Sequence, residues 1–198
     1  MRLVKILGVA LVAVFAFSAM AATGASAHVF EWSSAGLKLL ASADGPQLFI
    51  TLAGHLVCNK LLGNGVLEAA VTETQKVTVL YEECTVSVNA VTAKPDEPIL
   101  TEYEFNANGT VKILKHVTIL AKLAGLPCTI LVLPSGALST VKYDNINSNT
   151  EILVLSHVQE ILTDATGAGC AKQYKNERDA LYRGNAFVKV DGGQTKWV

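Results

Sequence analysis

Residues 101–122 alternate between apolar and polar side chains on both sides of a short turn, a pattern that predicts a β-hairpin. We place the turn at residues 107–109 (Ala-Asn-Gly), with Gly109 in the left-handed conformation that three-residue hairpin loops require. A two-residue loop would set Phe105 against Lys112, and a slip of one residue moves every side chain to the other face. Only the three-residue loop gives one apolar and one polar face. It pairs Tyr103 with Ile113, Glu104 with Lys112 and Phe105 with Val111.

Short apolar stretches separated by turn residues continue along the chain, and long apolar runs at helical spacing are absent after residue 45. This pattern predicts about ten strands and an all-β fold, an antiparallel β-sandwich. Residues 34–43 fit a short helix or an irregular strand equally well. The predicted strands outside the central hairpin are 47–57, 66–72, 76–82, 84–90, 128–133, 138–143, 151–162 and 180–190.

Two polar segments divide these strands. Residues 63–65 (Gly-Asn-Gly) are typical of a turn and lead into a second predicted hairpin, in which 66–72 faces 76–82. Residues 93–98 contain two prolines and three charged side chains, which predicts a loop. We expect the second strand of the central hairpin to be long, because apolar side chains recur from Val111 to Ala121 with Lys115 as the interruption.

The N-terminal residues have the pattern of a secretory signal peptide. Arg2 and Lys5 precede an apolar run of fifteen residues, 6–20, and the stretch ends in Ala-Ser-Ala at 25–27. The run is shorter than the roughly 20 apolar residues that span a bilayer, which argues against a membrane anchor. We therefore expect a signal-peptide helix, cleavage after Ala27, and a single secreted domain of residues 28–198 without a membrane span.

The cysteines fit this compartment. An even number of cysteines in an exported chain predicts disulfides, and three pairings of four cysteines are possible. We favour Cys58–Cys84 with Cys128–Cys170, because each pair then flanks its own set of strands. A zinc site is disfavoured, since the chain lacks a Cys-x-x-Cys spacing.

The net charge of the chain limits the kinds of molecule that it could bind. Of the 16 basic residues, Arg2 and Lys5 belong to the predicted signal peptide, which leaves 14 against 17 acidic residues and a formal charge of −3. Nucleic-acid binding requires a clustered basic surface, so we expect no nucleic-acid partner. An extracellular or cell-surface ligand remains compatible with this composition.

Several short segments occur together in a familiar combination. They are Asn-Ala-Asn-Gly-Thr-Val at 106–111, Pro-Cys-Thr-Ile at 127–130, Leu-Ser-Thr-Val-Lys-Tyr at 138–143, and Tyr81 three residues before Cys84. In this combination the chain resembles small secreted two-disulfide β-proteins of soil actinobacteria. The resemblance covers most of residues 46–170 and implies export, two disulfides and an all-β fold. It implies no active site, because the shared residues are structural.

Cleavage after Ala27 would expose His28 as the first residue. Its α-amine and imidazole could then chelate copper, an arrangement that looks like the histidine brace of secreted lytic polysaccharide monooxygenases. The brace needs a second histidine, for which His55, His116 and His157 are the candidates. Against it, His28 is followed by Val29 instead of the glycine common in those enzymes, and surface aromatic residues are few.

Other reactive patterns are weak. Ser156 and His157 are adjacent, but a catalytic triad is defined by geometry and no surrounding motif supports one. The carboxylate pairs at 82–83 and 96–97 are typical of solvated loops. The sequence therefore predicts no catalytic residue, no cofactor and no metal site apart from the copper alternative at His28. We expect a secreted or cell-surface β-sandwich with a structural or binding role.

Overall fold

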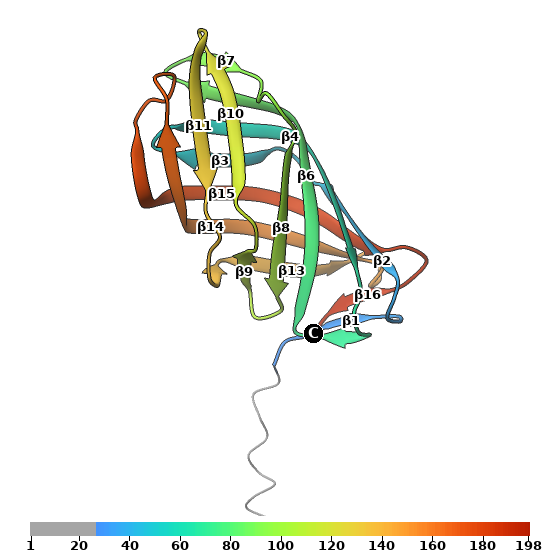
Figure 1. The fold of residues 1–198 in the computed structure, drawn as a ribbon. Coiled ribbons are helices and arrows are strands. Elements are labelled where there is room, and N and C mark those ends of the chain that lie inside the picture. The colour runs from blue at the N-terminus through green and yellow to red at the C-terminus, as the bar shows by residue number, and fades with distance from the viewer. Residues whose placement is uncertain (1–26) are drawn as a thin grey trace, which may run out of the picture.

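All elements of the described chain are β-strands, as the sequence pattern predicts (Figure 1). The structure is a computed structural model that describes residues 27–198, so the predicted signal-peptide helix lies outside the described residues. Among residues 27–198 no helix has the length and apolar character needed to span a membrane. The strands are β1 (Phe30–Trp32), β2 (Lys38–Ala43), β3 (Gln47–Thr51), β4 (Gly54–Val66), β5 (Val71–Thr72), β6 (Thr74–Val88), β7 (Val91–Ala93), β8 (Ile99–Asn106), β9 (Thr110–Ile113), β10 (Val117–Leu123), β11 (Leu126–Val132), β12 (Leu138–Ser139), β13 (Val141–Ile146), β14 (Glu151–Thr166), β15 (Tyr174–Val190) and β16 (Thr195–Trp197).

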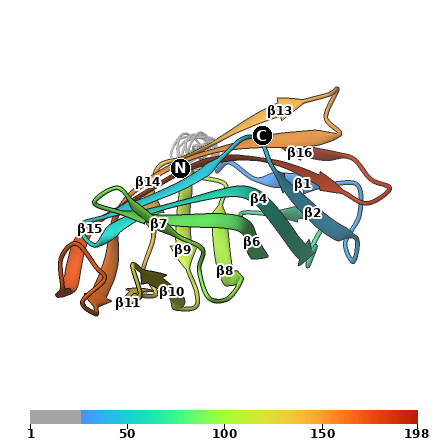
Figure 2. The ribbon, with the colours of Figure 1, turned by 90° about the horizontal axis from the view of Figure 1, so that it is seen from above.

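Most of these strands belong to one antiparallel sheet of 13 strands, which bends over itself to form two layers. Figure 1 shows β8, β10 and β11 passing in front of β14 and β15, and Figure 2 shows the same two groups as separate layers. The alternating burial of β4, β6, β10 and β11 directs one apolar face of each strand into the space between the layers. The predicted β-sandwich is therefore confirmed.

The two layers are also joined at their edges. On one side β9 pairs with β12, where Leu138 lies opposite Val111, and on the other side β13 pairs along β14. Between these pairings the Thr140 amide donates to the His157 carbonyl at 3.0 Å. Because these pairings satisfy backbone groups that would otherwise be free, they protect the edges of the sheet from pairing with other chains.

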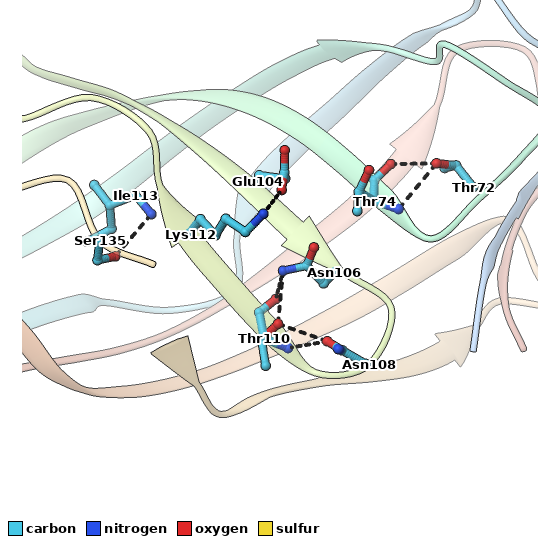
Figure 3. A network of polar contacts seen from close by, with 9 residues as sticks. All are labelled: Thr72, Thr74, Glu104, Asn106, Asn108, Thr110, Lys112, Ile113 and Ser135. Atoms are coloured by element: carbon cyan, nitrogen blue, oxygen red, sulfur yellow. Dashed lines mark hydrogen bonds and ion pairs between the residues drawn. The ribbon is translucent and has the colours of Figure 1, made fainter. Parts of the chain in front are cut away.

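The central hairpin has the register that the sequence predicts (Figure 3). Gly109 has φ +86°, as the three-residue turn requires. On the outer face Lys112 Nζ lies 2.6 Å from Glu104 Oε1. The Asn108 side chain holds the turn, since Thr110 donates to its Oδ1 from both the backbone amide and the hydroxyl. The directly opposite residues of the hairpin are Tyr103–Ile113, Glu104–Lys112, Phe105–Val111 and Asn106–Thr110.

The long second strand of this hairpin was predicted wrongly. Residues 114–116 interrupt it, and β10 forms a separate hairpin with β11. Continued alternation would direct Lys115 into the apolar interior, which is costly for a charged group. The break places Lys115 outside instead, where its Nζ lies 2.8 Å from Glu102 Oε2.

The predicted hairpin of 66–72 with 76–82 is also wrong. Residues 63–65 lie inside β4, which pairs with β6 so that Gly63 is opposite Val79. The glycines do not form a turn but allow β4 to pack closely against its neighbours. A Cβ on Gly63 would lie 2.7 Å from the Ala41 Cβ on β2. Most of residues 66–72 connects strands, with Val66 and Val71 exposed.

The ends of the described chain and the short strand β5 form a small second sheet, in the order β16-β1-β5. Residues 38–43, whose structure the sequence left open, are strand β2, whereas the earlier β1 pairs with β16 near the C-terminus. The Val29 amide donates to the Val198 carbonyl at 2.9 Å, and the Val198 amide donates back at 3.0 Å. Trp197 Nε1 donates to the Ala107 carbonyl at 2.9 Å, which anchors this sheet to the turn of the central hairpin.

Two disulfides secure the fold with the favoured pairing. Cys58–Cys84 joins directly opposite residues of β4 and β6. Cys128–Cys170 ties β11 to the connection between β14 and β15. Disulfides of this kind are typical of proteins that fold outside the cytoplasm.

Candidate functional site

His28, the candidate copper ligand, is exposed and takes part in the terminal contacts. Its ring stacks on Trp197 with 4.7 Å between the ring centroids. Its Nδ1 lies 3.2 Å from the Val198 carbonyl oxygen and donates a hydrogen bond to it when the ring carries its proton on Nδ1. A brace at His28 would need this nitrogen for the metal, so the hydrogen bond to Val198 would have to break.

The three possible partners of His28 lie on separate elements. His55 is the second residue of β4, about 36 Å along the strand from Val66, where the chain approaches β1. His116 is exposed in the link between β9 and β10, and His157 lies 3.0 Å from the side chain of Gln159. In the part of the chain that the structure describes, no group of histidine, cysteine and acidic side chains could hold a metal ion. The copper hypothesis remains a prediction.

Ser156 and His157 do not form a catalytic pair. They are consecutive residues of β14, so their side chains point to opposite faces of the sheet, and Ser156 faces the interior. Of the acidic pairs, Glu82 binds Lys60 on the outer face, whereas Asp96 and Glu97 are exposed in a loop.

One concave feature lies between the two layers of the sandwich. Between the two layers there is an apolar cavity of about 120 Å³, lined by strands of both layers and by β1. No acidic, basic or histidine side chain is among the residues that line it. The large side chains that line it from β6, β8 and β15 are Gln75, Val77, Val79, Tyr81, Ile99, Tyr103, Phe105, Tyr182 and Val188.

Small inward residues explain why this space stays open. Ala41 on β2 and Ala186 on β15 face the interior and are only half-buried, whereas the space beside Gly184 is filled by the side chain of Gln47. Across the cavity, Tyr103 and Phe105 are also half-buried although both point inward. A strand face that mixes small and large residues in this way leaves a gap that its neighbours do not fill.

Tyrosine hydroxyls form the polar part of the cavity wall. The hydroxyls of Tyr81 and Tyr103 are 3.1 Å apart and hydrogen-bonded, and the ring of Tyr182 meets that of Tyr81 edge-on at 6.2 Å. The Tyr182 hydroxyl donates to Oε1 of Gln47. Gln47 is itself fixed, because its Nε2 donates to the Gly45 and Asn185 carbonyls at 2.9 Å each.

These hydroxyls are neutral at physiological pH. Burial raises the pKa of Tyr81 well above 10, and the nearby Tyr103 and Tyr182 hydroxyls add to the effect. Burial raises the pKa of Tyr103 to about 12 despite the opposing hydrogen bond from Tyr81. Burial likewise raises the pKa of Tyr182. The cavity wall therefore carries no charge and favours an uncharged occupant.

Two further buried polar atoms, on residues that line the cavity, lack a hydrogen-bond partner among the described residues. They are Oγ1 of Thr101, a residue that is 2% exposed, and Nε1 of Trp32, a residue that is 7% exposed. Buried polar groups are nearly always paired in folded proteins, so each of these atoms calls for an explanation.

Sequence reasoning identified the inward direction of Tyr103, Phe105 and Tyr182 but not the cavity. The available signal was the pair of small residues at inward positions of neighbouring strands, Ala41 and Ala186, which becomes visible only once the strand register is known. Comparison with protein-family models, with curated proteins and with solved structures finds no match to this chain.

Proposed function

We propose that the chain is an exported β-sandwich protein that binds a small uncharged molecule in its interior and performs no catalysis. The observation that carries this proposal is the uncharged apolar cavity between the layers. Its volume of about 120 Å³ is close to that of the roughly 150 Å³ apolar cavities that take up benzene. The predicted signal peptide and the two disulfides support export.

Toluene tests this proposal, because it has the size and polarity that the cavity favours. We expect a rise in Tm, together with shifts of methyl resonances from cavity-lining side chains in NMR spectra. A ligand at ten times its Kd stabilises the folded state by about 1.4 kcal/mol, which corresponds to about 3–6 °C for a domain of this size.

Two alanine variants make the experiment specific. Ala186→Leu adds a side chain inside the cavity and should abolish the effect of toluene, whereas Ala137→Leu adds the same atoms at an exposed loop position and should preserve it. Equal responses of both variants, or none in the unmodified protein, would contradict binding in the interior.

Copper titration separates this function from the alternative at His28. A chain that begins at His28 is titrated with Cu(II) and followed by EPR, with His28→Ala as control. Because Nδ1 of His28 is bound to the Val198 carbonyl, we expect no sub-micromolar type-2 copper signal. Tight binding that is lost in His28→Ala would favour the copper protein.

A further inference from the structure

A second hollow lies on the outer face of β13, β14 and β15, three neighbouring strands of the large sheet. Tyr143 and Tyr182 point inward, so the residues next to them on β13 and β15 point outward. The hollow has a volume of about 380 Å³, within the range of about 300–1,000 Å³ that small-molecule sites occupy in proteins. The side chains that line it on this face are Thr140, Lys142, Leu155, His157, Arg183 and Asn185.

The strand register arranges these side chains in two rows across the sheet. In one row His157 lies opposite Arg183 and, on its other side, exchanges backbone hydrogen bonds of 3.0 and 2.9 Å with Thr140. In the other row Leu155 lies between its partners Lys142 and Asn185. Lys142 and Arg183 are therefore at diagonal corners, about 10 Å apart across the sheet and about 7 Å along it. Both side chains are long and flexible enough to reach one ligand above β14.

The hollow has a positive charge without compensation. No acidic side chain lines it, and among residues 27–198 neither Lys142 nor Arg183 has a carboxylate within 4 Å. The nearest acidic residues along these strands are Asp144, in the next row of β13, and Asp44, whose amide donates to the Asn185 carbonyl. The expected secreted chain has 14 basic and 17 acidic residues, so its overall charge of −3 does not favour anions. An anion is therefore attracted by this local pair of cations.

Hydrogen-bond donors surround the hollow from three strands. Lys142 and Arg183 can only donate, and the Asn185 amide and the Thr140 hydroxyl can donate as well. The Gln159 amide nitrogen lies 3.0 Å from Nε2 of His157, and when it donates there the ring carries its proton on Nδ1. Donors on several sides match a phosphate or sulfate group, whose oxygens point in several directions.

We propose that this hollow binds a small organic phosphate or sulfate ester, with the anionic group between Lys142 and Arg183 and the organic group over Leu155. Leu155 is the half-buried apolar side chain between the donors, and the hollow is larger than a bare phosphate needs. The site goes beyond the proposed function, because it lies on the outer face of the sheet and takes a charged ligand.

Four probes test the ligand class by NMR titration at constant ionic strength: phenyl phosphate, phenyl sulfate, inorganic phosphate and phenol. We expect at least one ester to shift the resonances of Leu155 and His157 at millimolar concentration. Inorganic phosphate should shift the same resonances but bind more weakly, because it makes no contact with Leu155. Phenol lacks the anionic group and should leave these resonances unchanged. The ester that binds more tightly identifies the anion as phosphate or sulfate.

Three charge variants test the position of the anion. Lys142→Gln and Arg183→Gln should each weaken ester binding by about 3- to 10-fold, because each removes one charged hydrogen-bond donor at a half-open site. Lys122→Gln removes the same charge from an exposed position of β10 and should leave ester binding unchanged. Circular dichroism and Tm verify that each variant is folded.

A fourth variant, Leu155→Ala, tests the contact with the organic group. It should weaken ester binding and leave the binding of inorganic phosphate unchanged.

Three results would overturn the proposal. If Lys122→Gln weakens binding as much as the two variants in the hollow, the anions respond to the overall charge and not to this site. If inorganic phosphate binds as tightly as both esters, the hollow does not recognise an organic group. If neither ester shifts Leu155 and His157 at millimolar concentration, the hollow is not a binding site. None of these results affects the uptake of toluene between the layers, so this inference and the proposed function fail separately.

Discussion

At the scale of single residues, the inward tyrosines determine the character of the interior. Tyr81, Tyr103 and Tyr182 bring hydroxyl groups into a space that is otherwise apolar, and Tyr143 donates to the Asn106 carbonyl at 3.0 Å near the small sheet. Burial raises the pKa of each of these four phenols. The interior is therefore polar enough to orient a ligand but remains uncharged.

The raised pKa values predict how stability depends on pH. The folded protein holds its phenol protons above pH 10, whereas the unfolded chain releases them near pH 10. The unfolded state then binds fewer protons, so stability is unaffected below pH 10 and falls as the pH rises toward the folded pKa, about 12 for Tyr103. Phenolate absorbance should show these four tyrosines ionising at a higher pH in the folded protein than in guanidinium chloride, where they ionise near pH 10. Ionisation near pH 10 in the folded protein would contradict their burial.

Gly63 shows how closely the strands approach one another. A Cβ at this position would lie 2.7 Å from the Ala41 Cβ and 3.3 Å from Cγ1 of Val77. We expect Gly63→Ala to lower the free energy of unfolding by about 1–3 kcal/mol, because the neighbouring strands must move. At Gly136 an added Cβ meets nothing within 4 Å, so Gly136→Ala is the matched control and should be nearly neutral in urea denaturation. Equal losses would show that the close approach costs nothing.

At the scale of elements, the β8–β9 hairpin connects three parts of the molecule. Its inner face supplies Tyr103 and Phe105 to the cavity, and β9 pairs with β12. The turn accepts two further hydrogen bonds, from Trp197 Nε1 to the Ala107 carbonyl and from the Val141 amide to the Gly109 carbonyl. Distortion of this turn should therefore affect the edge of the sheet as well as the hairpin.

Gly109 and Gly125 allow this contribution to be measured. Both have positive φ, +86° and +82°, and replacing either with alanine should cost about 1–2 kcal/mol for the left-handed backbone. At Gly109 the new Cβ would also lie 2.8 Å from the Val141 carbonyl oxygen, whereas at Gly125 it meets nothing within 4 Å. Urea denaturation should therefore show a larger loss for Gly109→Ala than for Gly125→Ala. A smaller or equal loss would mean that the turn can move away from β13 freely.

At the scale of the whole molecule, the disulfides differ in accessibility. Cys58, Cys84 and Cys128 are buried, whereas Cys170 is half-buried in the connection between β14 and β15. Since a thiolate must reach a sulfur atom to reduce it, we expect mild reductant to open Cys128–Cys170 first. Alkylation followed by mass spectrometry gives the order, and prior opening of Cys58–Cys84 would contradict it. In the chain-entropy description the bonds contribute about 3.5 kcal/mol for Cys58–Cys84 and about 4 kcal/mol for Cys128–Cys170.

The sequence predicted those features that depend on local pattern. The register of the central hairpin follows from alternation and turn chemistry, and the all-β class follows from the spacing of apolar runs. The errors arose where tertiary packing determines the strand boundaries. The glycines of residues 63–65 allow neighbouring strands to approach closely, and the strand ends before Lys115 so that this side chain lies outside the apolar interior. The cavity could not be predicted, because it depends on which small residues face which tyrosines after the sheet bends.

The hydrogen bonds between Val29 and Val198 have a practical consequence for engineering. Since the two ends of the described chain are neighbours, a short glycine linker could join Val198 to His28, and new ends could be opened in the loop at residues 94–98. Such a circular permutant should keep the two-layered fold, with the former N- and C-termini joined in a continuous chain. A protein fused at the new ends would then extend from the side of the molecule that lies away from the paired strands β1 and β16.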